Sequence, residues 1–126
     1  MSKVSRESAS EGGDFGPVIA HTEHFDGYTV DFVTFKESVD HTPLLKGLPD
    51  DRCQCPHWGY VLKGSITYRY ADRDEIIEAG DAYYAPPGHV PVANEPGTEC
   101  VQFSPAAELK KSMDAIMRNM QALQVG

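Results

Sequence analysis

The sequence predicts an all-β protein, an antiparallel sandwich or barrel, that ends in one α-helix. Three observations lead to this fold class. From residue 56 to residue 104, turn-forming residues recur about every eight to twelve positions, the spacing of short strands joined by tight connections. The segments between these turns are rich in β-branched and aromatic residues. Residues 105–126 instead repeat apolar residues at intervals of three and four, the period of a helix.

The N-terminal third divides into a tail, two strands and a long connection. Residues 1–15 are rich in Ser, Gly and Glu and predict a flexible tail. Residues 18–20 and 28–35 are apolar and β-branched and predict strands. Residues 36–51 carry prolines, a glycine and several charges, and predict a connection with a short helical turn near Leu44.

Six further strands are expected after residue 56, each bounded by Gly, Pro, Asn or Asp. Together with the first two strands they would form one barrel domain over residues 16–104. The predicted strands are 57–62, 65–70, 75–78, 82–85, 90–93 and 99–104.

A C-terminal helix is predicted over residues 105–126. Ser104 is a candidate N-cap, Pro105 suits the first helical position, and Glu108 suits the positive end of the helix dipole. One apolar stripe runs along this helix, and two partners for it remain open: the barrel of the same chain or a second subunit. The stripe consists of Leu109, Met113, Ile116, Met117 and Met120.

The composition is that of one globular domain. The chain has 126 residues, 40% of them hydrophobic and 24% charged. Its net charge of −8 argues against nucleic acid and anionic membrane surfaces, because phosphate binding needs basic surface. No apolar run approaches the ~20 residues of a membrane-spanning helix. We therefore expect neither nucleic acid nor a membrane as a partner.

The cysteine content indicates a reducing environment. Three cysteines are an odd count, which excludes a complete intrachain disulfide framework. Residues 1–13 are polar and lack the apolar segment of a signal peptide. Reduced thiols and a cytoplasmic location are therefore expected.

The segment Cys53-Gln54-Cys55-Pro56-His57 is the most informative part of the chain. It places three potential metal ligands at alternate positions, and alternate side chains of a strand point to the same face. A fully extended strand would separate the Cα atoms of Cys53 and His57 by about 13 Å, beyond their combined reach of about 10 Å to one ion. One ion can bind all three only if the backbone bends, and Pro56 gives a reason for a bend. The alternative is that both cysteines and the histidine are ordinary core residues.

The glycine and proline framework of residues 18–104 resembles the cupin superfamily, in particular its small single-domain members. Gly80 and Pro86-Pro87-Gly88 match the Gly-x5-Pro-x-Gly of the second cupin motif, and Gly64 matches the final glycine of the first. The resemblance implies a small antiparallel cupin β-barrel, of the double-stranded β-helix or jelly-roll type, with a site in its mouth.

The ligand positions of the cupin pattern are occupied by atypical residues. Counting back from the first-motif glycine places His57 at the Glu ligand, Cys53 at the second His and Asp51 at the first. In the second motif, Pro91 stands at the His position, and the nearby histidine is His89. The resemblance therefore implies that His89 would lie beside the first motif.

The expected metal-ligand set is Cys53, Cys55, His57 and His89. Thiolates and imidazoles favour zinc and select against Mg²⁺, Ca²⁺ and Mn²⁺, while iron and nickel stay open. Four protein ligands would make a closed structural site, and three would leave an open position for water or substrate. Two alternative ligands are considered, Asp51 in place of Cys53 and His41 at the barrel mouth.

Three functional hypotheses follow. The first is a metal-binding cupin, with zinc as the favoured metal, whose pocket binds an unknown small molecule; it could be an enzyme of unassigned reaction. The second is a non-catalytic ligand-binding or sensor barrel whose metal is structural or absent. The third is a partner-binding domain that dimerises through its barrel edge and helix. By analogy with cupins a homodimer is expected, with Trp58 as an interface candidate.

Overall fold

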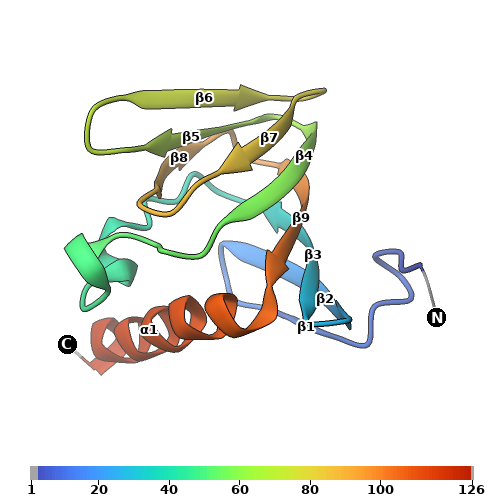
Figure 1. The fold of residues 1–126 in the computed structure, drawn as a ribbon, viewed down its shortest axis with the longest axis horizontal. Helices are drawn as coiled ribbons and strands as arrows, with labels where there is room; N and C mark the ends of the chain where they lie inside the picture. The colour runs from blue at the N-terminus through green and yellow to red at the C-terminus, as the bar shows by residue number, and fades with distance from the viewer. Residues whose placement is uncertain (1–2, 126) are drawn as a thin grey trace.

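Nine β-strands, two short 3-10 helices and one α-helix make up the part of the chain that the computed structural model describes, residues 3–125. Strands supply most of the regular structure, and the one long helix follows the last strand directly (Figure 1). The strands are β1 Glu11–Asp14, β2 Val18–Phe25, β3 Tyr28–Phe35, β4 His57–Lys63, β5 Ser65–Arg69, β6 Asp74–Glu78, β7 Ala82–Ala85, β8 Val90–Asn94 and β9 Thr98–Pro105. The helices are η1 Thr42–Leu45, η2 Pro49–Asp51 and α1 Ala106–Val125.

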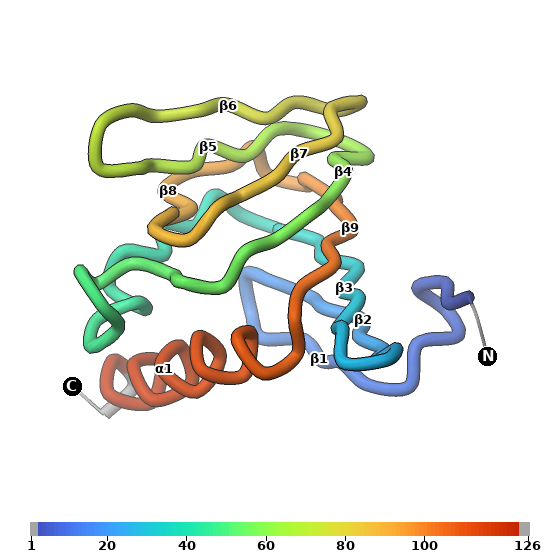
Figure 2. Tube along the Cα trace, viewed as in Figure 1, coloured from blue at the N-terminus to red at the C-terminus, as the bar shows by residue number. Residues whose placement is uncertain are grey.

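The strands form two antiparallel sheets. The larger sheet has the order β1-β2-β3-β9-β4-β7, and the smaller has the order β6-β5-β8. Figure 2 shows the path of the chain. After β4 the chain leaves the larger sheet, β5 and β6 form a hairpin in the smaller sheet, and β7 pairs with β4 in the larger sheet again. The chain thus alternates between two sheets, as in a sandwich or an open barrel.

The predicted strands are all present in the structure. The ranges 28–35 and 82–85 agree with β3 and β7, and the predicted helical turn at Leu44 lies in η1. The first predicted strand is longer than expected, because β2 pairs with β3 along its whole length to Phe25. For residues 56–104 the sequence therefore located each connection between strands.

The predicted tail over residues 1–15 needs correction. Residues 11–14 form β1, which pairs with β2 from Glu11 opposite Thr22 to Asp14 opposite Ile19. The residues of β1 have low strand propensity, but Gly12 adopts a φ of +138° and lies so close to Ala20 that a Cβ would strike its carbonyl oxygen. Tertiary pairing thus outweighs local propensity here.

The start of the helix also differs from the prediction. Pro105 is the last residue of β9, and α1 begins at Ala106, while residue 126 lies outside the described residues. Ser104 therefore does not serve as the N-cap; its hydroxyl lies 2.7 Å from Nδ1 of His57 instead. The strand continues because Ser104 stays paired with Thr29 of β3.

The main core lies between the two sheets. Side chains from both sheets contribute, among them Val61 of β4 and Ile66 of β5, each nearly inaccessible to solvent. The turn between these strands needs Gly64, whose φ is +82° and whose missing Cβ leaves room for Thr98. This motif glycine is thus required by both backbone conformation and close packing.

The α1 helix lies along the bottom of the view in Figure 1 and contacts η1, β9 and β3. The backbone N–H of Ala106 donates to the carbonyl of Gly27 at 2.8 Å, and near the other end the Asn119 amide donates to the carbonyls of Leu44 and Lys46 at 2.7 and 2.9 Å. The apolar stripe of the helix faces a cavity inside the same chain. Leu109 and Ile116 pack against a buried cluster of the same chain, whereas Met113 and Met117 remain 38% and 40% exposed.

Among residues 3–125, no helix is both long enough and apolar enough to cross a bilayer.

Candidate metal centre and its cavity

Two of the candidate ligands are joined through the backbone. Cys53 and His89 form an isolated antiparallel bridge, in which the N–H of Cys53 donates to the carbonyl of His89 at 3.1 Å. In return, the N–H of Gly88 donates to the carbonyl of Cys53 at 2.8 Å. The bridge brings the loop before β4 against the loop before β8, so residues far apart in the sequence share one site.

The candidate metal centre consists of Cys53, His57 and His89. One potential ligand atom from each lies within 4.8 Å of the others. The Sγ of Cys53 and the Nε2 of His57 are 3.9 Å apart, close to the separation of about 3.6 Å expected for two ligands of a tetrahedral zinc ion. The three side chains are buried, with 6%, 7% and 1% of their surface exposed. The donor set and its spacing therefore fit a zinc ion.

Hydrogen bonds orient both imidazoles. The Nδ1 of His89 lies 2.7 Å from the carbonyl oxygen of Pro86, so it must donate, which leaves Nε2 unprotonated in the neutral ring. The Nδ1 of His57 lies 2.7 Å from the hydroxyl of Ser104. Such partners on the far side of the ring are typical of metal-binding histidines, because they fix the tautomer and the ring plane.

Burial keeps the imidazoles neutral. Desolvation, with a smaller contribution from repulsion by His89, lowers the pKa of His57 to about 3. Desolvation also lowers the pKa of His89, and the hydrogen bond to the Pro86 carbonyl opposes this shift. Neutral imidazole is the form that binds a metal, so both rings are in the ligating state at neutral pH.

The Cys53 thiol is protonated without a metal. Burial raises its pKa, and the Ser112 hydroxyl, 3.3 Å from its Sγ, opposes the shift. A thiol in this environment is inert as a nucleophile. A divalent metal bound to it would release the proton, because the thiolate is the ligating form.

Cys55 does not join the group that the structure brings together. Its side chain is buried, its Sγ lies 3.4 Å from the carbonyl of Pro56, and burial raises its pKa to about 12. The three alternate residues are all buried, as the spacing predicted, but β4 begins at His57 and the irregular backbone before it does not place Cys55 in the ligand group. The bend that the distance between Cys53 and His57 requires is present, and it leaves Cys55 out of the group.

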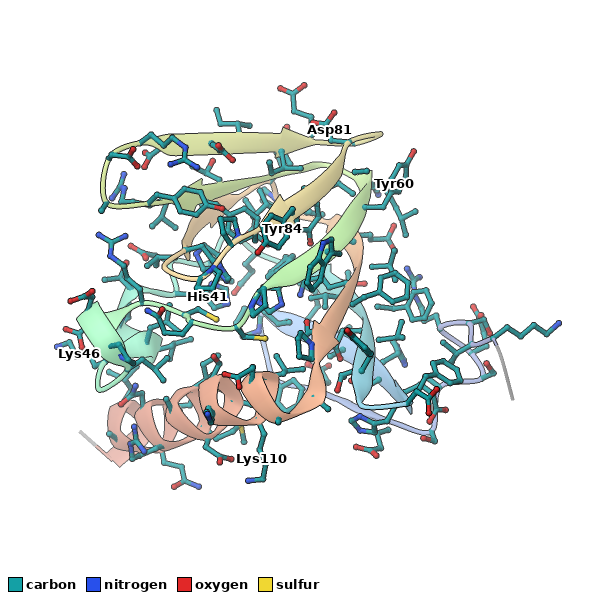
Figure 3. All side chains as sticks on the ribbon, viewed as in Figure 1. His41, Lys46, Tyr60, Asp81, Tyr84 and Lys110 are labelled. Carbon is teal, nitrogen blue, oxygen red and sulfur yellow. The ribbon has the colours of Figure 1, made fainter. Side chains whose placement is uncertain are left out.

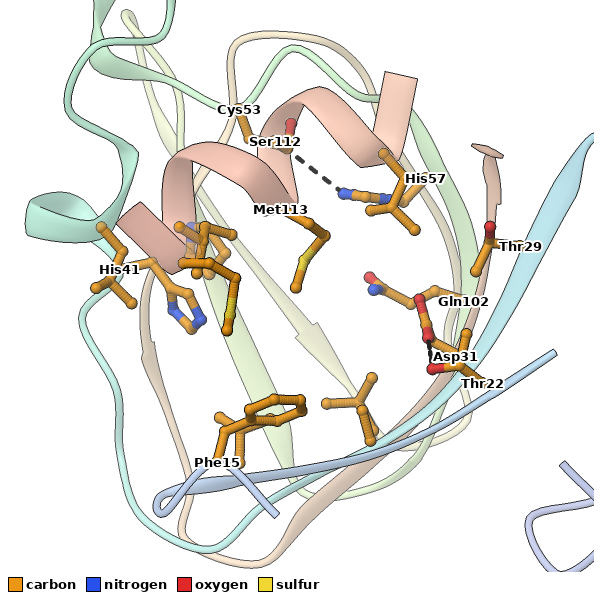
Figure 4. A pocket seen from close by; sticks show the side chains of 18 of the residues that line it. Phe15, Thr22, Thr29, Asp31, His41, Cys53, His57, Gln102, Ser112 and Met113 are labelled. Carbon is orange, nitrogen blue, oxygen red and sulfur yellow. Dashed lines mark hydrogen bonds between the residues drawn. The ribbon is translucent and has the colours of Figure 1, made fainter. Parts of the chain in front are cut away.

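The two alternative ligands also lie outside the group. Asp51 is exposed in η2, where its carboxylate accepts a hydrogen bond from the N–H of Gly47 at 3.0 Å. His41 immediately precedes η1 and lines the cavity without belonging to the ligand group (Figure 3), and Figure 4 shows it across the cavity from His57.

A cavity of about 690 Å³ lies next to the candidate ligands, between the larger sheet and α1. Cys53, His57 and His89 all line it, so a metal bound there would face the cavity. Figure 4 shows Met113 of α1 over the space between His41 and His57. The volume lies within the range typical of small-molecule sites, about 300–1,000 Å³.

Two polar residues of the cavity were missed by the sequence reasoning. Asp31 of β3 accepts a hydrogen bond from the Thr22 hydroxyl at 2.5 Å, and burial raises its pKa while this bond opposes the shift. Gln102 of β9 accepts hydrogen bonds through Oε1 from the hydroxyls of Tyr83 and Tyr68, at 2.7 and 3.3 Å. A charged residue within the apolar run 28–35 was the one signal that could have pointed to Asp31.

Solved structures share this fold. The chain is similar to an RmlC-like cupin from Shewanella frigidimarina, with 19% identity, 84% of this chain and 92% of that chain covered, and a TM-score of 0.58. It is similar to the polyketide cyclase RemF from Streptomyces resistomycificus, with 19% identity, coverage of 84% and 80%, and a TM-score of 0.57. KdgF from Halomonas sp. gives 20% identity, coverage of 75% and 86%, and a TM-score of 0.52.

Sequence comparison adds no family to this result. No protein-family model matches the sequence, and a search of curated proteins gives no significant match. The structural likenesses establish a small cupin fold, as the glycine and proline framework predicted. Its neighbours include a polyketide cyclase, and this chain carries a candidate Cys/His/His metal site within that fold.

Proposed function

We propose that the protein is a zinc-binding cupin whose cavity holds a small molecule next to the metal. The observation that carries the proposal is the grouping of Cys53, His57 and His89 around one point on the cavity wall. Both histidines are neutral and oriented through Nδ1, so they are prepared to bind a metal through Nε2. In His89 the tautomer is fixed with Nε2 unprotonated, and in His57 the Nε2 already lies 3.9 Å from the Cys53 Sγ, which places both nitrogens beside a buried thiol.

Zinc suits this donor set best. One thiolate and two imidazoles match zinc, whereas Mg²⁺, Ca²⁺ and Mn²⁺ prefer oxygen ligands. Three protein ligands leave the fourth tetrahedral position free, and here that position would face the cavity. A metal with an open position can polarise a bound oxygen or lower the pKa of bound water. Iron and nickel are the alternatives that a metal analysis would reveal.

A ligand-binding or sensor barrel without a reaction is the second candidate. The mostly apolar lining favours it, because such a lining binds an apolar ligand by burying its surface and needs no reaction to do so. In this case the metal would hold the ligand or stabilise the fold. Release of an unchanged ligand after prolonged incubation would support the second candidate, and conversion of the ligand would support an enzyme.

The metal proposal is tested by the zinc content of untagged protein purified without chelator. We expect about one zinc per chain, and its loss in His89→Ala. The matched control is His21→Ala, which replaces a histidine of β2 that lies outside the candidate group. Wild-type protein without metal that also shows no thermal stabilisation by added zinc, nickel or ferrous iron would refute the proposal.

A cytoplasmic location is part of the proposal. The three cysteines are free, and the metal-bound form requires Cys53 as a thiolate. A compartment that keeps thiols reduced preserves that ligand, whereas an oxidising one would compete with the metal for it.

We also propose a homodimer formed through the outer face of the larger sheet. Trp58 and Tyr84 stack with ring centroids 5.0 Å apart, and Phe103 lies directly opposite Trp58 on the next strand. These three side chains are 46%, 50% and 45% exposed, and Tyr60 continues the same face of β4 (Figure 3). Aromatic residues are enriched at interfaces. A monomeric mass in light scattering at micromolar concentration would refute the dimer, and Trp58→Ser should weaken it.

A further inference from the structure

His41 leaves a buried polar atom without a partner on the cavity wall. Its Nδ1 is inaccessible to solvent and makes no hydrogen bond within residues 3–125. Desolvation lowers the pKa of His41, with smaller opposing contributions from the carbonyls of Pro91 and Val39 and from the charge of Asp40, so the ring is neutral at neutral pH. Because Nδ1 is closed off from the cavity as well as from bulk water, a hydrogen-bonding ligand group would meet the ring at Nε2, the other nitrogen of this cavity-lining side chain.

Further hydrogen-bonding groups lie on the other side of the cavity from His41 (Figure 4). Gln102 uses Oε1 for the two tyrosine hydroxyls, so its amide N–H groups are free to donate toward the cavity that it lines. The Asp31 carboxylate also lines the cavity and bonds to Thr22 through one oxygen. A ligand that bonds to His41 on one side and to Gln102 or Asp31 on the other needs hydrogen-bonding groups at two separated positions.

The walls between these polar positions are apolar. Met113, Met117 and Met120 of α1 line the cavity together with Phe15 and Phe35, and Figure 4 shows Met113 and Phe15 on different sides of it. Methionine side chains adapt to irregular shapes, and their sulfur atoms make favourable contacts with aromatic rings. A flat ring system would therefore fit between the α1 methionines and the sheet better than a compact polar molecule would.

The lining has little positive charge to balance an anion. Among the described lining residues, Lys110 is the one lysine or arginine, and it is largely exposed, with its Nζ 3.0 Å from the Asp114 carboxylate. Asp31 instead adds negative potential when ionised. An anionic group that lies in the cavity away from the proposed metal would thus lose its hydration without gaining a cationic partner.

We propose that the cavity binds an uncharged, hydroxylated aromatic ring compound that donates or accepts a hydrogen bond at His41. The inference rests on the proposed small-molecule pocket but not on the metal. His41 anchors one end of this ligand by a hydrogen bond, and Gln102 and Asp31 form hydrogen bonds with its opposite end.

The test uses 2,6-dihydroxynaphthalene as the probe, with isothermal titration calorimetry on the whole chain. We expect saturable binding that is about tenfold weaker in His41→Phe, the loss expected for one buried hydrogen bond. His41→Gln keeps hydrogen-bonding capacity and should recover most of the affinity. His21→Phe is the matched control, since His21 does not line this cavity, and it should change affinity less than twofold. Circular dichroism checks that each variant is folded.

Charge selectivity is tested with naphthalene-2,6-dicarboxylate on wild-type protein stripped of metal with a chelator, so that a carboxylate has no metal to bind. We expect the diol to bind at least tenfold more tightly than the dicarboxylate. Absence of diol binding, equal affinity for the dicarboxylate, or an unchanged affinity in folded His41→Phe would each overturn the inference. Zinc content and the thermal response to added metal are measured on untreated wild-type protein, so a chain that fails both metal tests but binds the diol through His41 refutes the metal proposal alone.

Discussion

Replacing Cys53 and Cys55 one at a time tests which residues bind the metal. The structure groups Cys53 with two histidines, whereas the sequence pattern also predicted Cys55 as a ligand. Both sulfur atoms belong to the same buried cluster, with 6% and 1% of each residue exposed. Without metal, Cys53→Ala and Cys55→Ala should therefore cost similar stability, about 1–2 kcal/mol each for the lost buried sulfur. The two variants should differ only when zinc is present, because only Cys53 lies within the 4.8 Å group.

The size of the difference follows from the number of ligands. Structural zinc sites bind with about 10–16 kcal/mol over four ligands, so one ligand contributes about 3 kcal/mol, or roughly 100-fold in Kd. At a zinc concentration 100 times the wild-type Kd, zinc stabilises the wild-type protein by about 2.7 kcal/mol. The Cys53→Ala variant would then be half saturated and gain only about 0.4 kcal/mol. Cys55→Ala should keep the full wild-type gain.

The assay is thermal unfolding with and without zinc, followed by zinc analysis of the dialysed proteins. For a chain of this size we expect zinc to raise Tm by roughly 10 °C in wild-type protein and in Cys55→Ala, and by roughly 2 °C in Cys53→Ala. Cys100→Ala is a control for losing a buried thiol in the other core cluster, and it should keep the zinc response. Equal loss of the zinc response in Cys53→Ala and Cys55→Ala would refute the three-residue site.

Three other predictions concern the residues around the site and the barrel. Ser104→Ala leaves the buried Nδ1 of His57 without its partner, so chelator competition should show zinc affinity reduced about 10- to 100-fold. The native pKa of Asp31 is raised, so the native state binds this proton more tightly than the unfolded state and wild-type stability falls as pH rises through the interval between the two pKa values. Asp31→Asn should therefore be more stable than wild type at pH 8 in urea titrations, with a difference that disappears near pH 3; a constant difference would contradict the shift. Gly64→Ala combines a positive φ with a clash against Thr98 and should lower the free energy of unfolding by about 2–4 kcal/mol in urea, whereas a loss below about 0.5 kcal/mol would contradict this.

The strands after residue 56 were predictable because each ends in a residue with a steric reason to turn. Gly64 and Gly80 adopt positive φ angles of 82° and 94°, so their positions in the sequence report backbone geometry directly. Strand β1 has no such local signal. Its residues 11–14 become a strand because the exposed edge of β2 offers hydrogen bonds, and this depends on the tertiary fold.

The candidate site was predictable only in part. The spacing of Cys53 and His57 indicated a ligand pair with a bend between them, and that bend is what excludes Cys55. His89 could be placed near them only through the resemblance to cupins, because its proximity arises from an isolated bridge between two loops. Gln102 could not be found from the sequence, because whether a polar strand residue faces a cavity depends on what α1 covers.

The way α1 is fastened determines which wall of the cavity can open for ligand exchange. The helix is held near both ends, by the hydrogen bonds of Ala106 and Asn119, so it forms a rigid wall of the cavity. The opposite wall includes Glu11, Gly12 and Phe15, which belong to or follow a four-residue edge strand paired on one side only. Edge strands of this length separate at low free-energy cost compared with a packed helix. The rate at which ligand enters and leaves would then be set by fraying of the first strand, so a bulky fusion at the N-terminus would alter exchange kinetics before it altered affinity.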